Sequence, residues 1–195
     1  MSEKLGLIAG RGELPLILAE RARAAGREVV AVDLSGEARP ELEGMAVEMR
    51  RLRAGQLGEI IRFLRKSGVR EAVVAGKVDK MTVFRPDELD QTALELLSTL
   101  KAKRDIDLLK GIASLFEREG IRLIDQRRYL GDLIPERGVL AGEPDERVIE
   151  DARFGIELAR GIADLGVGQT VVVKGGVPLA VEAAEGTDEA IRLSL

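Results

Sequence analysis

The chain has 195 residues, of which 45% are hydrophobic and 33% charged, and its formal net charge is -4 at pH 7. This acidic balance gives no electrostatic basis for binding nucleic acid, so we expect no nucleic-acid partner. Because the sequence has neither cysteine nor histidine, it excludes disulfides, thiolate nucleophiles, zinc–thiolate sites and imidazole bases. Any catalysis must use carboxylates, lysine, arginine, hydroxyls, backbone N–H groups or an oxygen-bound ion such as Mg²⁺, which favours phosphate chemistry.

Residues 5–33 predict a β-α-β unit. The apolar run 5–9 is typical of a buried strand, and a glycine-bearing turn follows it at 10–12. Apolar residues then recur at helical spacing over 14–25, with Pro15 in the first turn, where a missing N–H costs nothing. A second buried strand is expected over 28–33.

Strands and helices continue to alternate up to residue 124. The further strands are expected at 46–49, 71–75 and 121–124, and the further helices from 57 to Gly68, over 87–100 and over 105–119. This alternation predicts an α/β fold, with a Rossmann-like N-terminal domain whose mostly parallel sheet is covered on both faces.

The composition changes near residue 130, which predicts a domain boundary. A stretch at 131–144 is rich in glycine and proline and has little periodicity, so we interpret it as a linker. It would separate a Rossmann-like domain at 1–130 from a smaller domain at 145–195.

The smaller domain is expected to be α+β. Asp145 caps a helix that runs to about residue 165, and strands at 170–174 and 178–182 are joined by a Gly175-Gly176 turn. One helix and one hairpin are marginal in water. We therefore expect an incomplete domain, finished either by a partner in a homo-oligomer or, as we favour, by residues beyond 195.

The segment Gly10-Arg11-Gly12-Glu13-Leu14-Pro15 lies at a predicted strand-to-helix junction, where N–H groups and the helix dipole attract anions. Asp33, about 20 residues further on, gives a pattern like a dinucleotide-binding fingerprint, although Pro15 replaces its third Gly or Ala. The pattern is consistent with phosphate or nucleotide contact, with an NAD site, or with a tight turn that needs glycines only for its shape.

The segment Gly76-Lys77-Val78 follows another predicted strand. Ligands of open α/β sheets bind outside the carboxyl ends of the strands, so Lys77 would face a phosphate at the same edge as the first turn. The alternative is an ordinary solvated lysine.

A basic cluster of Lys101, Lys103 and Arg104 precedes Asp105 and Asp107. The cluster could grip an anionic head group. Alternatively, Asp105 is a helix N-cap and Asp107 a favourable charge in the first helical turn.

Acidic residues gather after the last predicted strand. Glu182, Glu185 and Asp188 lie within seven residues, and such charges repel one another unless a cation, Mg²⁺ or Lys174, lies among them. The alternative is a solvated turn with a helix cap at Thr187 or Asp188.

In their order and spacing, these segments resemble the LpxI-type UDP-2,3-diacylglucosamine pyrophosphatases. The residues that carry the resemblance are Gly10-Arg11-Gly12-Glu13-Leu14-Pro15, Gly76-Lys77-Val78, Asp105-Ile106-Asp107-Leu108-Leu109, Gly168-Gln169-Thr170-Val171-Val172-Val173 and Ala180-Val181-Glu182-Ala183-Ala184-Glu185-Gly186-Thr187-Asp188. The resemblance implies two domains with the substrate in the crevice between them. It also implies hydrolysis of UDP-2,3-diacylglucosamine to UMP and lipid X (2,3-diacylglucosamine 1-phosphate) in lipid A biosynthesis, with Mg²⁺ or another divalent cation as cofactor.

Roles for individual residues follow from the resemblance. Asp188 is the expected catalytic and metal-binding residue. The expected substrate-binding residues are Gly10, Arg11, Gly12, Leu14, Gly76, Lys77, Val78, Asp105, Gln169, Glu185, Gly186 and Thr187. The family pattern further implies an Asp where this sequence has Gly166, and a C-terminal segment beyond residue 195 that supplies more acidic residues.

The sequence shows neither a signal-peptide pattern nor an apolar stretch of about 18 residues, so we expect a cytoplasmic protein. A substrate with two acyl chains implies transient contact with the inner face of the cytoplasmic membrane. Two other functions stay open: a non-catalytic module that binds a nucleotide or lipid, and an NAD-binding oxidoreductase that uses the glycine turn and Asp33.

Overall fold

The computed structural model describes residues 3–37, 39–78, 85–100 and 105–194. The chain forms two compact units, one within residues 1–134 and the other consisting mainly of residues 135–195. We describe the two units separately.

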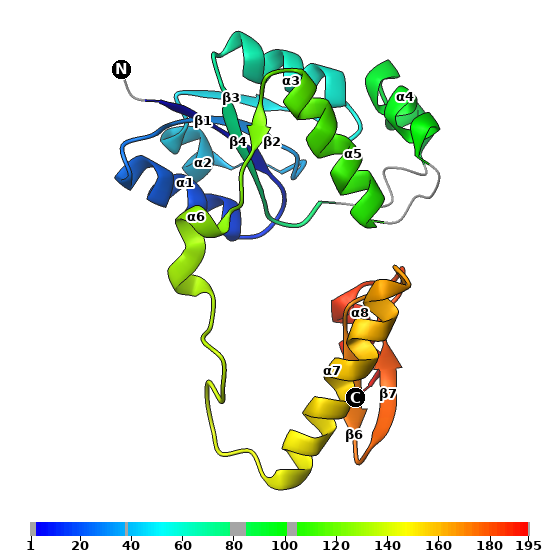
Figure 1. Cartoon of the computed structure of the whole chain (residues 1–195). Helices are drawn as coiled ribbons and strands as arrows, with labels where there is room; N and C mark the ends of the chain where they lie inside the picture. Colours follow the sequence, from blue (N-terminus) through cyan, green and yellow to red (C-terminus); the bar gives the residue numbers. More distant parts are fainter. Residues whose placement is uncertain (1–2, 38, 79–84, 101–104, 195) are drawn as a thin grey trace. The chain divides into compact units, whose positions relative to one another are not determined.

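The first unit is built on a five-stranded parallel sheet (Figure 1). Its strands are β1 (Lys4–Ala9), β2 (Glu28–Asp33), β3 (Glu48–Arg51), β4 (Glu71–Ala75) and β5 (Arg122–Leu123). They lie in the order β3-β2-β1-β4-β5, so the direction of winding reverses at β1, as in the doubly wound nucleotide-binding folds. The predicted Rossmann-like α/β fold is confirmed.

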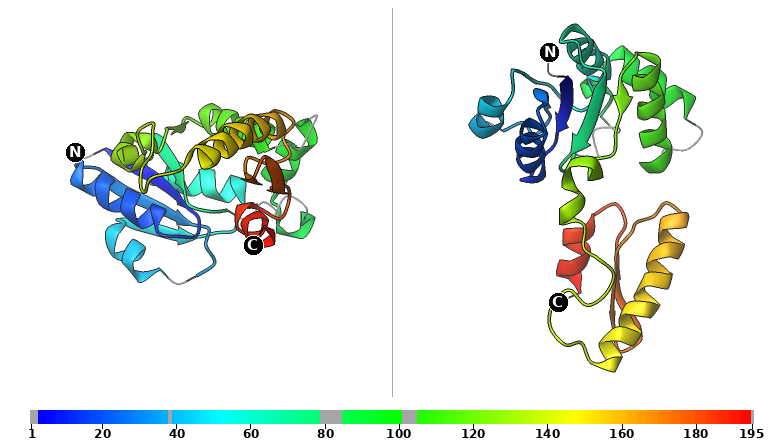
Figure 2. Two further views of the ribbon diagram at one scale, coloured as in Figure 1. Left: turned by 90° about the horizontal axis from the view of Figure 1, so that it is seen from below. Right: turned by 60° about the vertical axis from the view of Figure 1, so that its left-hand side comes forward.

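Helices cover both faces of this sheet (Figure 2). They are α1 (Leu14–Ala24), α2 (Pro40–Met45), α3 (Leu57–Lys66), α4 (Gln91–Thr99), α5 (Asp105–Arg118) and α6 (Arg127–Leu130). On one face, Ile8 of β1 packs with residues of α3, α4 and α5 such as Leu64 and Phe116. On the other face, Leu7 packs with α1, α2 and α6 through residues such as Leu18. Successive residues of β1 point to opposite faces, so one strand contributes to two apolar cores.

The strand register brings three strand ends to one edge of the sheet. Ala9 of β1 lies opposite both Asp33 of β2 and Ala75 of β4. The loops that follow these strands therefore start side by side, which places the predicted glycine turn next to Gly76 and Lys77.

The element boundaries differ from the predicted ones in several places; for example, the strand predicted at 46–49 is β3, which spans Glu48–Arg51. Helix α2 was not predicted, because its six residues are too few to show a helical period. Helix α4 begins at Gln91 and not at 87, because the Asp90 side chain accepts the N–H of Ala93 at 2.9 Å and caps the helix there. Helix α6 is followed directly by the 3₁₀ turn Gly131–Leu133, so the start of the predicted linker has helical structure.

The second unit contains α7 (Glu146–Asp164), the antiparallel strands β6 (Val171–Lys174) and β7 (Val177–Val181), and α8 (Thr187–Leu193). As predicted, Asp145 caps α7 by accepting the N–H of Val148 at 2.9 Å, and Gly175-Gly176 forms the hairpin turn. Both turn glycines have positive φ. Their N–H groups donate to Asp151 of α7, each at 2.7 Å, which ties the hairpin to the helix.

The second unit buries very little of its surface. Among its described residues only Ala190 is fully buried, and α7 contains no buried residue. Across all the ranges that the structure describes, no helix is both long and apolar enough to span a membrane.

Candidate functional site

The first part of the candidate site is formed by the two glycine-bearing loops at the carboxyl edge of the sheet. Arg11 and Lys77 pair as an antiparallel bridge, with the Arg11 N–H donating to the Lys77 carbonyl at 2.8 Å and the Lys77 N–H donating to the Arg11 carbonyl at 3.0 Å. The Gly10 N–H donates to the carbonyl of Ala75 at 2.8 Å. The sequence predicted that both loops lie at one sheet edge, and this is confirmed; the pairing of their backbones was not foreseen.

Close approach of the two backbones explains two of the glycines. A Cβ on Gly10 would lie 2.5 Å from the Lys77 carbonyl oxygen, and a Cβ on Gly76 would lie 2.6 Å from that of Arg11. Gly76 also has φ of 88°, which favours glycine. The close packing of the two loops is therefore a sufficient reason for glycine at both positions, without a ligand.

The start of α1 presents backbone N–H groups. In the part of the chain that the structure describes, the N–H groups of Gly12, Glu13 and Leu14 donate to no acceptor, and Pro15 has none to donate. Glu13 stands at the N-cap position without a side-chain capping bond. Free N–H groups at the positive end of an 11-residue helix are suited to phosphate oxygens. The Leu14 side chain packs against the core, so Leu14 would contribute through its N–H.

A buried arginine that the sequence analysis missed lies against this turn. Arg39 is only 9% exposed, and its guanidinium donates to the carbonyls of Gly10 at 2.7 Å and Gly12 at 2.5 Å. No sequence signal marked it, because it precedes the short, unpredicted α2. In return, the Arg11 side chain donates to the carbonyl of Ser35 at 3.3 Å.

Asp33, the residue behind the NAD alternative, has a different role. It is 1% exposed, and its Oδ1 accepts the N–H of Ser35 at 3.0 Å. Its Oδ2 lies 3.7 Å from the Nε of Arg51 and accepts no hydrogen bond within the described ranges. The carboxylate is enclosed by the protein and braces the loop after β2, so it is not presented at the surface to a ribose hydroxyl.

The other predicted residues of the first unit are less informative. Val78 directly follows the paired loop and is partly exposed. Asp105 is the first residue of α5, but its side chain lies outside the described residues, as do Lys101, Lys103 and Arg104. Asp107 lies in the first turn of α5.

In the second unit, the structure brings several predicted residues together around Glu182. Its carboxylate accepts the N–H of Gln169 at 3.1 Å and the hydroxyl of Thr187 at 3.0 Å. The Thr187 hydroxyl is also 3.4 Å from that of Thr170. Gly168 is needed here, because a Cβ would lie 2.1 Å from the Glu182 carbonyl oxygen. Glu182 thus links the start of β6 to the start of α8.

The remaining acidic residues lie in the adjoining turn. The Glu185 carboxylate accepts the N–H of Ala183 at 2.9 Å, and Gly186, with φ of 88°, leads into α8. Asp188 lies in the first helical turn of α8. Among the residues described, no three acidic side chains gather into a group that could hold a metal ion by themselves.

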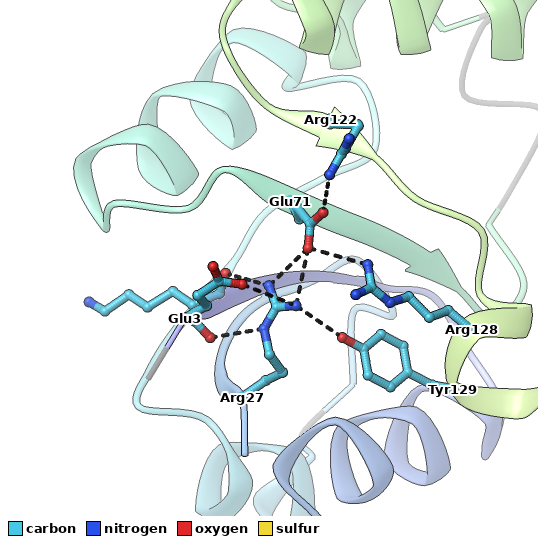
Figure 3. A network of polar contacts seen from close by, with 7 residues as sticks. Glu3, Arg27, Glu71, Arg122, Arg128 and Tyr129 are labelled. Carbon is cyan, nitrogen blue, oxygen red and sulfur yellow. Dashed lines mark hydrogen bonds and ion pairs between the residues drawn. The ribbon is translucent and has the colours of Figure 1, made fainter. Parts of the chain in front are cut away.

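A network of polar contacts in the first unit lies at the opposite, amino edge of the sheet (Figure 3). Glu71, at the start of β4, accepts hydrogen bonds from Arg122 and from Arg27, whose Nη1 and Nη2 are each 3.1 Å away. Arg128 lies 3.6 Å from the same carboxylate, and the Tyr129 hydroxyl contacts Arg27. The hydrogen bond from Arg122 is the main reason that the pKa of Glu71 lies below its ordinary value, and the hydrogen bond from Arg27 lowers it further. This network attaches α6 to the sheet and has no part in the candidate site.

Comparison with known proteins identifies relatives of this chain. The model of the LpxI N-terminal domain matches residues 4–133, and that of the LpxI C-terminal domain matches residues 136–194. A UDP-2,3-diacylglucosamine pyrophosphatase LpxI from Caulobacter vibrioides is 35% identical over 195 residues, covering 97% of this chain and 68% of the relative.

Solved structures resemble the chain only distantly. The biotin carboxylase subunit of pyruvate carboxylase is 16% identical with a TM-score of 0.40, covering 86% of this chain and 28% of that one. An N5-carboxyaminoimidazole ribonucleotide synthetase in complex with ADP is 14% identical with a TM-score of 0.40, covering 99% of this chain and 44% of the other. Since both family models match in order and together span nearly all of the chain, the chain belongs to the LpxI family.

Proposed function

We propose that this protein hydrolyses the pyrophosphate bond of UDP-2,3-diacylglucosamine and releases UMP and lipid X in lipid A biosynthesis. The observation that carries the proposal is the 35% identity, over 97% of the chain, to a relative named for action on this substrate. The absence of histidine and cysteine agrees with it, since metal-assisted phosphate hydrolysis needs only oxygen ligands and a carboxylate.

In this proposal the paired loops of the first unit bind the phosphate or nucleotide part of the substrate. The N–H groups of Gly12, Glu13 and Leu14 supply donors at a helix N-terminus. Lys77 adds a positive charge from the neighbouring loop. Asp105, Gln169 and Thr187 remain further proposed substrate-binding residues on the basis of the resemblance.

We further propose Mg²⁺ or another divalent cation as cofactor, with Asp188 as its protein ligand. Mg²⁺ usually binds one or two carboxylates together with substrate phosphates, so a site without a cluster of three described acidic residues fits its chemistry. When bound, such an ion neutralises pyrophosphate charge and polarises a P–O bond. The Asp188 carboxylate would orient the attacking water and accept its proton.

The test is UMP release from UDP-2,3-diacylglucosamine in the presence of Mg²⁺, followed by chromatography. We expect turnover by the wild-type protein, loss of turnover on chelation of divalent cations, and a rate reduced at least about 100-fold in Asp188→Asn. Asp164→Asn, at the exposed end of α7, is the matched control and should leave the rate unchanged. Substrate that binds but is recovered intact would indicate a non-catalytic binding module and contradict the proposal.

Transient contact with the inner face of the cytoplasmic membrane belongs to the same proposal, because both acyl chains of the substrate reside in a bilayer. Co-sedimentation with liposomes checks it. The protein should sediment with liposomes that contain the substrate and remain in the supernatant with liposomes that lack it. Equal sedimentation with both, or with neither, would contradict this part of the proposal.

A further inference from the structure

The glycine turn and the loop after β2 hold each other through two arginines. Arg39, at the end of that loop, donates to the carbonyls of Gly10 and Gly12, while Arg11 of the turn donates to the carbonyl of Ser35. The two arginines therefore tie together loops that follow neighbouring strands. The contacts of Arg39 are the shorter ones and come from the more buried side chain.

The charged group of Arg39 has unusual partners. Arg27, an arginine of the same unit that is buried to a similar degree, serves as the comparison. The side chain of Arg27 is 10% exposed and pairs with the carboxylates of Glu71 and Glu3. Arg39 is 9% exposed, yet none of the described carboxylates forms an ion pair with it, and its hydrogen-bond partners are backbone carbonyls. Burying a cation without an anion is costly, so a bound anion nearby would compensate the charge.

The hydrogen bonds of Arg39 also fix the direction of a backbone donor. In a planar trans peptide, the C=O and the following N–H point in opposite directions. Because Arg39 holds the Gly12 carbonyl, the N–H of Glu13 must point away from the guanidinium. In the same way, the Lys77 N–H holds the Arg11 carbonyl at 3.0 Å and sets the direction of the Gly12 N–H. Two successive N–H groups are thereby held in place with no acceptor among the described residues, an arrangement suited to an anion.

We infer that Arg39 is a positioning residue for the anion site of the glycine turn. It orients the Glu13 N–H toward a phosphate oxygen of a nucleoside diphosphate and polarises that peptide, while lying on the side of the peptide opposite the ligand. This inference rests on the proposed function, in which the turn receives the pyrophosphate part of the substrate. It adds a residue that contacts the backbone of the turn and not the ligand.

The experiment measures UDP binding by calorimetry in the wild-type protein and in Arg39→Ala, Arg39→Lys and Arg65→Ala. Arg65 is the matched control, since its substitution removes the same charge from α3, where the guanidinium pairs with Glu119. We expect Arg39→Ala to weaken UDP binding at least about 10-fold, Arg39→Lys to weaken it less because the charge remains, and Arg65→Ala to leave it unchanged.

Two further readouts separate positioning from a structural role. In ¹⁵N NMR spectra, the Glu13 amide resonance should shift on addition of UDP in the wild-type protein and shift much less in Arg39→Ala and Arg39→Lys. Added methylguanidinium should restore part of the affinity that Arg39→Ala loses and should leave the affinity of Arg65→Ala unchanged. If Arg39→Ala does not fold, Arg39→Lys, which keeps the charge, carries the same comparison.

Each outcome decides the inference. If Arg39→Ala binds UDP with wild-type affinity, the inference is overturned and the proposed function stays intact. The same holds if Arg39→Lys binds UDP with wild-type affinity and its Glu13 amide responds as in the wild-type protein. If the wild-type protein binds no UDP and its Glu13 amide does not respond, the turn is not an anion site and the inference is also overturned. UMP release in the assay above would then still support hydrolysis, with the phosphates bound elsewhere.

Discussion

The two units of this protein are held together by different kinds of contact. In the first unit, strands such as β1 are buried on both faces and lie between two apolar cores. In the second unit, the one fully buried residue among those described is Ala190, and the elements are joined by polar contacts such as those of Asp151 and Glu182. Five strands with helices on both faces remove far more apolar surface from water than two strands with a helix.

The contrast between an apolar core and polar contacts determines how each candidate residue is held. The glycine turn and Lys77 extend from buried strands and are fixed by backbone pairing, which depends little on nearby side chains. Gln169 and Thr187 are fixed by hydrogen bonds to the carboxylate of Glu182, a half-buried residue. We therefore expect substitutions to affect stability strongly in the first unit and mainly local order in the second.

The largest expected effect comes from the buried sheet. Leu7→Ala removes a fully buried side chain from β1 and should lower the free energy of unfolding by about 2–5 kcal/mol. Leu179→Ala in β7, where the side chain is 46% exposed, is the matched control and should cost less than about 1 kcal/mol. Urea unfolding followed by circular dichroism measures both. Equal losses would mean that the two units are stabilised in the same way.

A smaller effect is expected where the two loops meet. Gly10→Ala places a Cβ 2.5 Å from the Lys77 carbonyl oxygen and should cost about 1–3 kcal/mol, with weaker UDP binding as the loops separate. Gly44→Ala in α2 is the control, since its Cβ would meet no atom within 4 Å, and it should be neutral or stabilising by up to about 1 kcal/mol. A Gly10→Ala protein with wild-type stability and affinity would refute the close pairing.

The Glu71 network should make the first unit sensitive to acid. Because Arg122 and Arg27 hold the pKa of Glu71 below its ordinary value of 4.5, its contribution to stability is complete above that value. The contribution is lost as the pH falls through the lower pKa of the folded state. Glu71→Gln should therefore cost about 1–3 kcal/mol at pH 7, and the difference from the wild type should shrink in acid.

Glu189 in the second unit provides the control for this pH dependence. Arg192 likewise lowers the pKa of Glu189, but the carboxylate is exposed, so solvent screens the pair. Glu189→Gln should leave the pH dependence of unfolding unchanged. Thermal unfolding between pH 3 and pH 7 measures both variants, and a pH profile that Glu71→Gln fails to alter would rule out this role of the network.

The smallest effect is expected in the hairpin. Asp151→Ala removes the acceptor of the Gly175 and Gly176 N–H groups and should reduce the stability of the hairpin by about 1–2 kcal/mol. Hydrogen exchange of the β6 and β7 amides should become faster, while that of β1 stays the same. Glu150→Ala, an exposed neighbour on α7, should change neither. Faster exchange in β1 as well would show that the two units unfold together.

The fold class of the first unit could be predicted from the sequence alone, as could the segments that lie at the carboxyl edge of its sheet. The apolar strands 5–9, 28–33 and 71–75 are long enough to show their type, and parallel strands of one sheet bring their carboxyl ends together. The N-cap of α7 and the Gly175-Gly176 turn were equally predictable, because each depends on residues close together in sequence. The proposed roles of Asp188 and the other site residues remain predictions.

How the glycine turn is held depends on tertiary contacts, which the sequence did not predict. The sequence places Arg39 29 residues after Gly10 and in no recognisable pattern, yet the sheet brings its guanidinium to the carbonyls of the turn. The enclosure of Asp33 depends in the same way on how the loop after β2 folds back. Local sequence patterns predict helices, caps and turns because the contacts within these elements span only a few residues. Contacts between loops depend instead on how strands far apart in the chain are placed side by side.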